Sequence, residues 1–488
     1  MQTKNHPMSL SHKIKVINRD WINNNSIFHD QYSSFNKEEL CLHINFWKKF
    51  LIDLGATQGS KVGIATKNFE IYYIALTFAC FELGLNLIVL AKPFRSEKDL
   101  SINPFFPLDL LLLDILHDDK PFYDYYINNS KKVILDLDTI TPNLDVENIN
   151  LNISPSDVCL SSVSSGTTSN PKKIQHTHEF FYDLCSVNWQ SLDFREDDKV
   201  LHLYTFQHGS ALSIHFLPSL YVCKDHYFFT QKHYTSDEEW DLFPMYCRDN
   251  NITKLQSPYT GFTDKLINSI KRSKEGCPNL TIHVLSFINP DWLTVVKEGK
   301  VKKIVSIFGC SETAGPLFLP YIDKETIDFD PTFLGQPIEE YYKIRLEQNN
   351  LIVFIPTYNI EINTEDFIEE QNGNWYFIGK NKTQRINDIE VNLKDIRIIA
   401  KSVLGDFQRD IIIIVDEIYN KLYIASDDDN LHLHKQKVND AIKKFYNNQI
   451  ELTDTFNLFD LELFTGGGIK PSRQKILNHI RQINNEQY

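Results

Sequence analysis

Short apolar runs alternate along this chain with stretches in which apolar residues recur at helical spacing. Residues 61–65 and 87–91 form such runs, and residues 38–54 and 71–83 carry the helical pattern. A second series of the same kind fills residues 254–309. Strands that alternate with helices of this length indicate right-handed β-α-β units. The sequence therefore predicts an α/β fold built on largely parallel sheets.

The size and charge of the chain limit its possible domain number and binding partners. With 488 residues, the chain is too long for one ordinary core, and two or three domains are expected. A formal net charge of −14 argues against broad electrostatic binding to nucleic acid or to an anionic membrane. No apolar run approaches the length of a membrane span, and residues 1–20 lack the hydrophobic core of a signal peptide. We therefore expect a cytoplasmic protein.

Cysteine and histidine spacing gives no metal signature. The eight cysteines are scattered singly without a Cys-x-x-Cys pair, so we expect reduced thiols rather than disulfides or a zinc site. The pair His176-Thr177-His178 could bind a metal, but it has no third ligand nearby, and a structural role is favoured.

Residues 161–173 are rich in hydroxyl side chains, with one glycine, one proline and two lysines. No apolar face exists here at either helix or strand period, so the stretch is predicted to be a loop. Small residues and a nearby ammonium group suit phosphate oxygens, although a solvated surface loop has the same composition. A Walker loop is excluded by spacing, because Gly166 would need a second glycine where Pro171 stands.

Residues 307–315 follow an apolar strand pattern and end in a turn, where open α/β sheets place their ligands. The order Phe308-Gly309-Cys310-Ser311-Glu312 does not fit the Gly-x-Ser-x-Gly turn of hydrolases, because the next glycine is Gly315. The sequence therefore does not indicate a hydrolase nucleophile at Ser311.

The run Ser-Ser-Gly-Thr-Thr-x-x-Pro-Lys at residues 164–172 resembles the phosphate loop of the acyl-adenylate-forming enzymes: acyl-CoA synthetases, peptide-synthetase adenylation domains and luciferases. Four further segments resemble family motifs in the family's order, so the resemblance covers nearly the whole chain. It implies a large N-terminal AMP-binding region of stacked α/β layers with a small β subdomain, residues 1–380. A small mobile α+β lid domain, residues 381–488, would follow.

The resemblance also assigns roles. Phe308 would be the aromatic residue that stacks on adenine, Ser311 replaces a threonine, and Glu312 would bind the magnesium ion that travels with ATP. His208 would lie beside the substrate carboxylate, with a buried histidine bonded to backbone as the equal alternative. The remaining predicted nucleotide-binding or catalytic residues are Ser164, Ser165, Gly166, Thr167, Thr168 and Lys172 for the phosphates, Asp366 for the ribose hydroxyls, Lys380 where the family has arginine, and Lys470 at the reacting oxygens.

Several positions depart from the family pattern. Ser169 and Lys173 replace glycines of the phosphate loop, and residues 286–289, usually glycine-rich against the adenine, are not so here. Either other groups close the adenine pocket or the nucleotide preference has changed. Asp388 and Glu390 replace a glycine and a basic residue near the expected passage of a thiol arm.

The implied reaction is attack of a carboxylic acid on the α-phosphate of ATP, which gives an acyl-adenylate and pyrophosphate. Transfer to a thiol would follow, and the acidic residues make a carrier protein or another nucleophile a better acceptor than CoA. A different class stays open: a relative that keeps the fold, binds nucleotide and has lost turnover. The retained Lys172, Glu312, Asp366 and Lys470 favour the enzyme.

Overall fold

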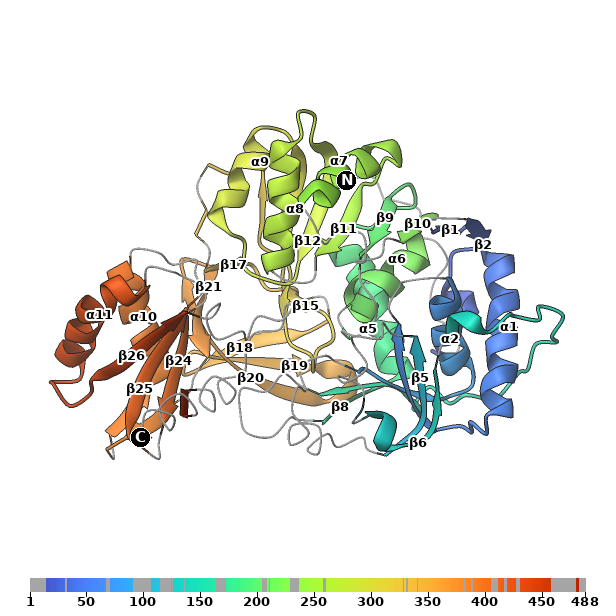
Figure 1. The fold of residues 1–488 in the computed structure, drawn as a ribbon, viewed down its shortest axis with the longest axis horizontal. Coiled ribbons are helices and arrows are strands. Elements are labelled where there is room, and N and C mark those ends of the chain that lie inside the picture. The colour runs from blue at the N-terminus through green and yellow to red at the C-terminus, as the bar shows by residue number, and fades with distance from the viewer. Residues whose placement is uncertain are drawn as a thin grey trace. The chain divides into compact units, whose positions relative to one another are not determined.

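The computed structural model describes residues 15–30, 33–66, 71–90, 107–114, 124, 126–135, 137–163, 173–203, 209, 211–228, 237–257, 260–327, 329–330, 332–339, 341–380, 383–387, 389–404, 411–416, 419–426, 431–457 and 480–481. The chain divides into two compact units (Figure 1). Unit 1 contains Met1–Ser164, Pro171–His233 and Ser311–Gly315, and unit 2 contains the remainder. Each unit is described by itself below.

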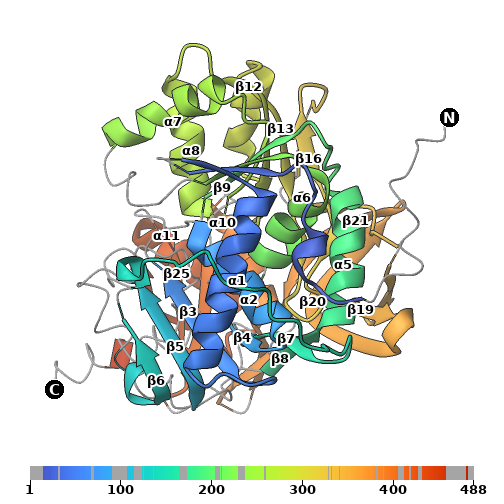
Figure 2. The same cartoon turned by 90° about the vertical axis from the view of Figure 1, so that its right-hand side faces the viewer.

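A six-stranded sheet forms the first half of unit 1, in the order β6-β5-β3-β4-β7-β8. Pairing is parallel except between β7 and β8, which are antiparallel. Helix α1 packs on α2, and α2 packs on β4 (Figure 2). The bounds are β3 (Lys61–Thr66), β4 (Asn86–Ile88), β5 (Leu108–Asp114), β6 (Ser130–Ile134), β7 (Val158–Val163), β8 (Lys173–Thr177), α1 (Lys37–Asp53) and α2 (Ile71–Glu82).

The rest of unit 1 holds a second set of strands in the order β9-β10-β1-β2, parallel except for the β1–β2 hairpin. Its elements are β1 (Ile27–His29), β2 (Ser34–Asn36), β9 (Lys199–His202), β10 (Asp225–Phe228), α5 (His178–Ser191) and α6 (Leu217–Val222). The parallel β-α-β prediction is confirmed in this unit.

Unit 2 begins with the parallel strands β11, β12 and β13, and β16 adds antiparallel to β13. Helices α7 and α8 pack on β12, and α9 packs on β13. These elements confirm the second predicted series: α7 (Asp237–Asp249), β11 (Lys254–Ser257), α8 (Thr260–Arg272), β12 (Cys277–Val284), α9 (Leu293–Lys297), β13 (Val301–Ser306) and β16 (Tyr321–Asp323).

An antiparallel sheet follows in the order β17-β21-β20-β19-β18. Gln348 and Asn349 adopt positive φ values of 48° and 67° and close the predicted hairpin between β18 and β19. The strands are β17 (Phe333–Gly335), β18 (Lys343–Glu347), β19 (Asn350–Ile355), β20 (Ile360–Gln371) and β21 (Asn374–Lys380). The predicted small β subdomain therefore exists.

The last part of unit 2 has a core of its own, whose buried members all lie between Ile386 and Leu452. Helices α10 and α11 pack on β24 and β26 (Figure 1). The elements are β22 (Thr383–Ile386), β23 (Ile389–Asn392), α10 (Leu393–Leu404), β24 (Ile411–Asp416), β25 (Lys421–Ser426), α11 (Leu431–Phe445) and β26 (Leu452–Asn457). The α+β prediction holds here, and the boundary after residue 380 stays a prediction because unit 2 runs through it.

All eight cysteines are free, as expected. Among the described residues, no group of three or more His, Cys, Asp or Glu side chains could hold a metal ion. Within those same ranges, no helix combines the length and apolar character that crossing a membrane requires.

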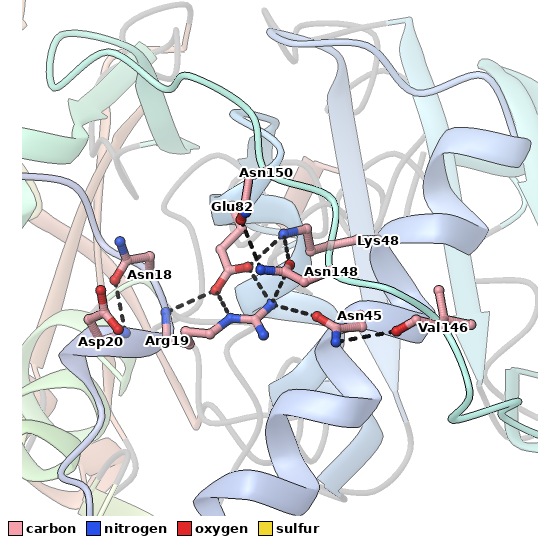
Figure 3. A network of polar contacts seen from close by, with 9 residues as sticks. All are labelled: Asn18, Arg19, Asp20, Asn45, Lys48, Glu82, Val146, Asn148 and Asn150. Carbon is pink, nitrogen blue, oxygen red and sulfur yellow. Dashed lines mark hydrogen bonds and ion pairs between the residues drawn. The ribbon is translucent and has the colours of Figure 1, made fainter.

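A buried ion network in unit 1 joins segments that are far apart in the sequence (Figure 3). Glu82, the last residue of α2, accepts two hydrogen bonds from the Arg19 guanidinium, from Nε at 2.8 Å and Nη2 at 2.6 Å. Lys48 of α1 donates to the same carboxylate at 2.8 Å and to Asn148 at 2.9 Å. Burial favours the neutral acid, but Arg19 and Lys48 hold the pKa of Glu82 below its usual value. The network fastens the N-terminal segment and the irregular stretch around residue 148 to two helices.

Buried histidines give unit 1 a predicted acid sensitivity. The Nδ1 atom of His226 shares a hydrogen bond with Nε2 of His202 at 3.3 Å. The Nε2 atom of His226 lies 3.2 Å from the carbonyl oxygen of Cys223. Burial lowers the pKa of His226 from 6.5 to about 4, while Asp225 opposes this shift and His29 adds to it. The unfolded chain therefore takes up a proton at a pH where the folded chain does not, and stability falls as the pH falls from 6.5 towards 4.

We expect His226→Phe to reduce this loss of unfolding free energy between pH 6.5 and 4 by up to about 3 kcal/mol. Urea unfolding at a series of pH values measures it. The exposed His432 provides the control, because its replacement by phenylalanine should leave the pH dependence as it is in the parent protein. An unchanged slope in His226→Phe would contradict the prediction.

Candidate nucleotide site

Glu312 lies on the turn at residues 311–315, which follows the apolar strand pattern. Ser311 is exposed and Glu312 half-buried, while Thr313 is buried and its hydroxyl donates to the Gly315 carbonyl oxygen at 3.2 Å. Ala314 adopts φ 50°, the left-handed region that L residues enter only with strain. The predicted tight turn is therefore present, and Thr313 stabilises it from within.

A histidine on β8 contacts this turn. The Nε2 atom of His176 lies 3.2 Å from the carbonyl oxygen of Ser311, and His176 is 5% exposed. Both residues belong to unit 1. The His-x-His pair thus serves backbone contacts rather than a metal, since His178 accepts from the Ile17 amide at 3.3 Å.

In unit 2, Phe308 belongs to a cluster of phenylalanines in which Phe318 is buried and the others are half-buried. Its ring centroid lies 6.1 Å from that of Phe287, 5.5 Å from Phe377 and 5.9 Å from Phe318. Phe287 and Phe377 are 4.9 Å apart. Phe287 stands in residues 286–289, the stretch without the usual glycines, so an aromatic ring lies beside Phe308. Which groups contact a base here stays a prediction.

Asp366 lies at a bulge between β19 and β20, where the register shifts between Asn350 and Ile352. The hydroxyl of Thr364 donates to the Leu351 carbonyl oxygen at 3.1 Å and accepts from the Asp366 amide at 3.2 Å. Asp366 is 4% exposed and pairs in register with Lys380 of β21. Bulges redirect side chains at sheet edges, and Thr364 fixes this one.

Comparison with protein families gives a match to the part of the chain that contains the Glu312 turn. Residues 111–350 match the family of AMP-binding enzymes. This region of the chain belongs to the family of AMP-binding enzymes. The match covers β5 to β19 and includes the Glu312 turn, so it lies on the part of the chain where the first site segments were predicted.

Solved structures of adenylate-forming enzymes share the fold along most of their length. The chain resembles O-succinylbenzoate Coenzyme A Synthetase (MenE) from Bacillus subtilis in complex with AMP, at a TM-score of 0.69 and 15% identity over 93% of this chain and 95% of that one. It resembles the anthranilate CoA ligase AuaEII in complex with anthranoyl-AMP, at 0.68 and 15% over 96% and 98%. McyG A-PCP complexed with phenylalanyl-adenylate gives 0.68 and 14% over 95% and 93%. A comparison with curated protein sequences gives no match.

Glu312 fits the magnesium ligand that the superfamily implies. Its carboxylate makes neither an ion pair nor a hydrogen bond with another residue in the described ranges, and it is half-exposed in a turn. A carboxylate oxygen is a ligand that Mg²⁺ prefers, and one or two protein carboxylates with substrate phosphates suffice. The lack of a larger acidic cluster among the described residues is compatible with such a site.

The structure describes both strands that flank the predicted phosphate loop. β7 extends to Val163 and β8 begins at Lys173, and these two residues pair. The loop prediction for residues 161–173 is therefore wrong at both ends, because the backbone of residues 161–163 and of Lys173 forms strand pairs despite the polar side chains. The loop residues themselves lie outside the described residues, as do His208, Asp388 and Lys470, and of Lys380 and Glu390 only the backbone is described. These site assignments stay predictions.

Glu365 occupies the position of the glycine in the superfamily's Thr-Gly-Asp segment and retains a glycine-like backbone, with φ 60°. The side chain of Asn363 accepts from the Glu365 amide at 2.9 Å and supports this conformation. The torsion angle of Glu365 therefore explains how this segment keeps its shape without a glycine.

We expect Glu365→Gly to raise the free energy of unfolding by about 0.5–1 kcal/mol, because glycine adopts positive φ without the penalty of a Cβ atom. Chemical denaturation measures the change. Glu369→Gly, at an exposed position on the same strand without positive φ, should instead lower stability by about 0.5–1 kcal/mol. Destabilisation of equal size in both variants would contradict the strain at residue 365.

Proposed function

We propose that this protein activates a carboxylic acid with ATP, forming an acyl-adenylate and releasing pyrophosphate. The observation that carries the proposal is Glu312: a half-exposed carboxylate with no partner in the described ranges, on the turn of an AMP-binding region. A carboxylate kept in this state, rather than used in an ion pair, is suited to a metal-nucleotide ligand. Asp366 and Phe308 add an acceptor for ribose hydroxyls and an aromatic surface for the base.

In this reaction a substrate carboxylate oxygen attacks the α-phosphorus, and the bond from that phosphorus to the bridging oxygen of the leaving pyrophosphate breaks. Both reactants are anions, so catalysis consists mainly of charge neutralisation and alignment. Lys470 bridges the substrate carboxylate and the α-phosphate oxygens, and the ammonium group of Lys172 lies with the hydroxyls of the phosphate loop on the outer phosphates. Bound magnesium supplies positive charge to the phosphates, and Glu312 anchors it.

Asp366 accepts hydrogen bonds from the two ribose hydroxyls, a task for which an ionised carboxylate is suited because it has only acceptor oxygens. The half-buried rings of Phe308, Phe287 and Phe377 offer an apolar surface for a planar base. His208 orients the substrate carboxylate. Glu312 therefore acts on the phosphates, and Asp366 and Phe308 act on the nucleoside.

The adenylate is then transferred to a thiol or another nucleophile. One structural neighbour is McyG A-PCP and another is an anthranilate CoA ligase, so the fold alone does not choose between acceptors. Asp388 and Glu390 repel the diphosphate of CoA, which favours a carrier-protein thiol. Efficient acyl-CoA synthesis by the purified protein would overturn this choice. The need for ATP and the eight free cysteines support a cytoplasmic location.

The deciding experiment is a pyrophosphate-release screen with ATP, magnesium and a panel of aromatic, fatty, amino and keto acids. We expect at least one acid to stimulate release above the rate without acid. Ser169, Lys173, Lys380 and the lack of glycines at residues 286–289 favour the second candidate, a nucleotide-binding relative without turnover. A melting temperature raised by ATP and magnesium, together with no stimulation by any acid, would support that candidate instead.

A further inference from the structure

His176 links the strand β8 to the backbone of the Glu312 turn. The acceptor is the carbonyl oxygen of Ser311, the residue directly before Glu312, at 3.2 Å from Nε2. A carbonyl oxygen only accepts hydrogen bonds, so Nε2 carries the proton in this contact. Burial lowers the pKa of His176 to about 4, and the ring is a neutral donor at neutral pH.

The imidazole ring has little freedom to move. It stacks on Phe180 with centroids 5.0 Å apart and an interplanar angle of 8°, and Phe181 lies 5.8 Å away. Both phenylalanines are in the first turn of α5, which follows β8 without an intervening loop. Thr177 caps this helix by accepting from the Phe180 amide at 3.3 Å. The donor atom is therefore held by the strand and by the helix start.

The strand itself is fixed in register. His176 pairs with Leu160 of β7, and the Cys159 thiol donates to the His176 carbonyl oxygen at 3.5 Å. β7 and β8 enter and leave the stretch predicted to bind the outer phosphates. A displacement of the Glu312 turn relative to this strand pair would thus break or stretch the His176 hydrogen bond.

The turn benefits from outside support because its own conformation is strained. Ala314 has φ 50°, a conformation that costs an alanine about 1–2 kcal/mol. Strained backbone persists only where surrounding contacts determine it. The hydrogen bond from His176 is one such contact, and it lies one residue from the carboxylate that we assign to the metal-nucleotide.

We propose that His176 is a positioning residue that fixes the Glu312 carboxylate for the magnesium complex of a nucleoside triphosphate. The inference rests on the proposed function of Glu312 and deepens it. The alternative role is structural only: a buried histidine that satisfies its own hydrogen bond and affects stability without affecting the metal-nucleotide.

The test replaces His176 with phenylalanine in the full chain. This variant keeps an aromatic ring stacked on Phe180 and removes the Nε2–H donor. We expect the magnesium concentration for half-maximal carboxylate-dependent ATP–pyrophosphate exchange to rise about 3–10-fold, the range for loss of one hydrogen bond. The rate at saturating magnesium should stay within about twofold of the parent rate. His176→Gln, whose amide can donate from a similar position, should restore the magnesium dependence.

His226→Phe is a matched control at neutral pH. His226 is also buried, and its Nε2 also lies 3.2 Å from a backbone carbonyl oxygen, that of Cys223. Its loss should lower stability and leave the magnesium dependence unchanged. Equal magnesium dependence in His176→Phe and the parent protein, or an equal shift in His226→Phe, overturns the positioning role.

A second readout separates this inference from the proposed reaction. The rise in melting temperature caused by ATP is measured with and without magnesium; we expect His176→Phe to lose most of the increment that magnesium adds. If magnesium raises the melting temperature of the ATP-bound parent protein but no acid supports ATP–pyrophosphate exchange, the proposed acid activation is refuted. The melting-temperature measurement alone then tests the role of His176. His176→Met replaces the phenylalanine variant if that variant does not fold, and failure of both to fold marks His176 as structural and overturns the proposal.

Discussion

Replacement of Lys470 by alanine should lower carboxylate-dependent ATP–pyrophosphate exchange by about 10²–10³-fold, the usual cost of removing one preorganised donor to a developing charge. The physical reason is the meeting of two anions: the variant loses the ammonium group that we assign to offsetting the repulsion between the attacking carboxylate and the α-phosphate. Exchange rates under saturating ATP and acid measure the effect. The three glycines before Lys470 predict a loop, so the melting temperature should not change.

The matched control for this variant is Lys443→Ala. Lys443 lies near the end of α11 and forms an ion pair with Glu451 at 2.9 Å, with both side chains partly exposed. Its removal should leave exchange unchanged, because a surface ion pair contributes little and no site role is assigned to it. Parent-level exchange in Lys470→Ala would refute the catalytic role of this lysine.

Lys470→Ala and His176→Phe should affect different kinetic parameters of the exchange reaction. Lys470→Ala lowers the maximal rate at every magnesium concentration, because it removes charge at the reacting oxygens. His176→Phe changes the magnesium concentration required, because it acts through the position of Glu312. Identical kinetic signatures in the two variants would mean that one of the assignments is wrong.

Alternation of apolar runs and helical patterns predicts the parallel sheets because it is a local property of the chain. Its limits are also local. Strand β6 begins at Ser130, before the apolar run that starts at Val133, because polar residues such as Lys131 can occupy the edge of a sheet. Helix α11 begins at Leu431, whereas the first of its described side chains to be buried is Val438, so its mostly exposed first turns show no clear apolar stripe.

Phe308, Glu312 and Asp366 are predicted from the sequence because short motifs in a fixed order contain them, and their nucleotide roles stay predictions. The contact from His176 to Ser311 spans 135 residues of sequence, and that between Arg19 and Glu82 spans 63. No local pattern records which side chains meet after folding. Only the tertiary structure identifies His176 as a neighbour of the turn.

Phe287 illustrates a departure that the sequence detects and the structure explains. The lack of glycines at residues 286–289 is visible in the sequence alone, but it leaves the chemistry of the replacement open. The ring of Phe287 near Phe308 and Phe377 supplies an apolar surface in place of exposed backbone. If the proposed nucleotide site is correct, we expect replacement of the Phe287 ring to weaken binding of the base.

Replacement of Glu82 by glutamine should lower the free energy of unfolding by about 3–5 kcal/mol, because two cations then lose the charge that compensates them in a buried site. Lys48 has a side chain that is 2% exposed, and the Arg19 side chain is 18% exposed, so water replaces little of the lost interaction. Glutamine keeps nearly the same volume, which separates charge from packing. Urea or guanidinium unfolding at neutral pH measures the change.

An exposed ion pair on α1 is the control for the Glu82→Gln variant. Lys49 and Asp53 form an i,i+4 ion pair with side chains that are 50% and 57% exposed. Asp53→Asn should change the free energy of unfolding by less than about 0.5 kcal/mol, because water solvates the remaining lysine. If Glu82→Gln costs no more than Asp53→Asn, the burial of Arg19 and Lys48 does not contribute to stability as described. A large difference between two carboxylate-to-amide changes, one buried and one exposed, measures what burial adds: the remaining cations are poorly solvated, and the NH2 group of glutamine cannot accept their hydrogen bonds.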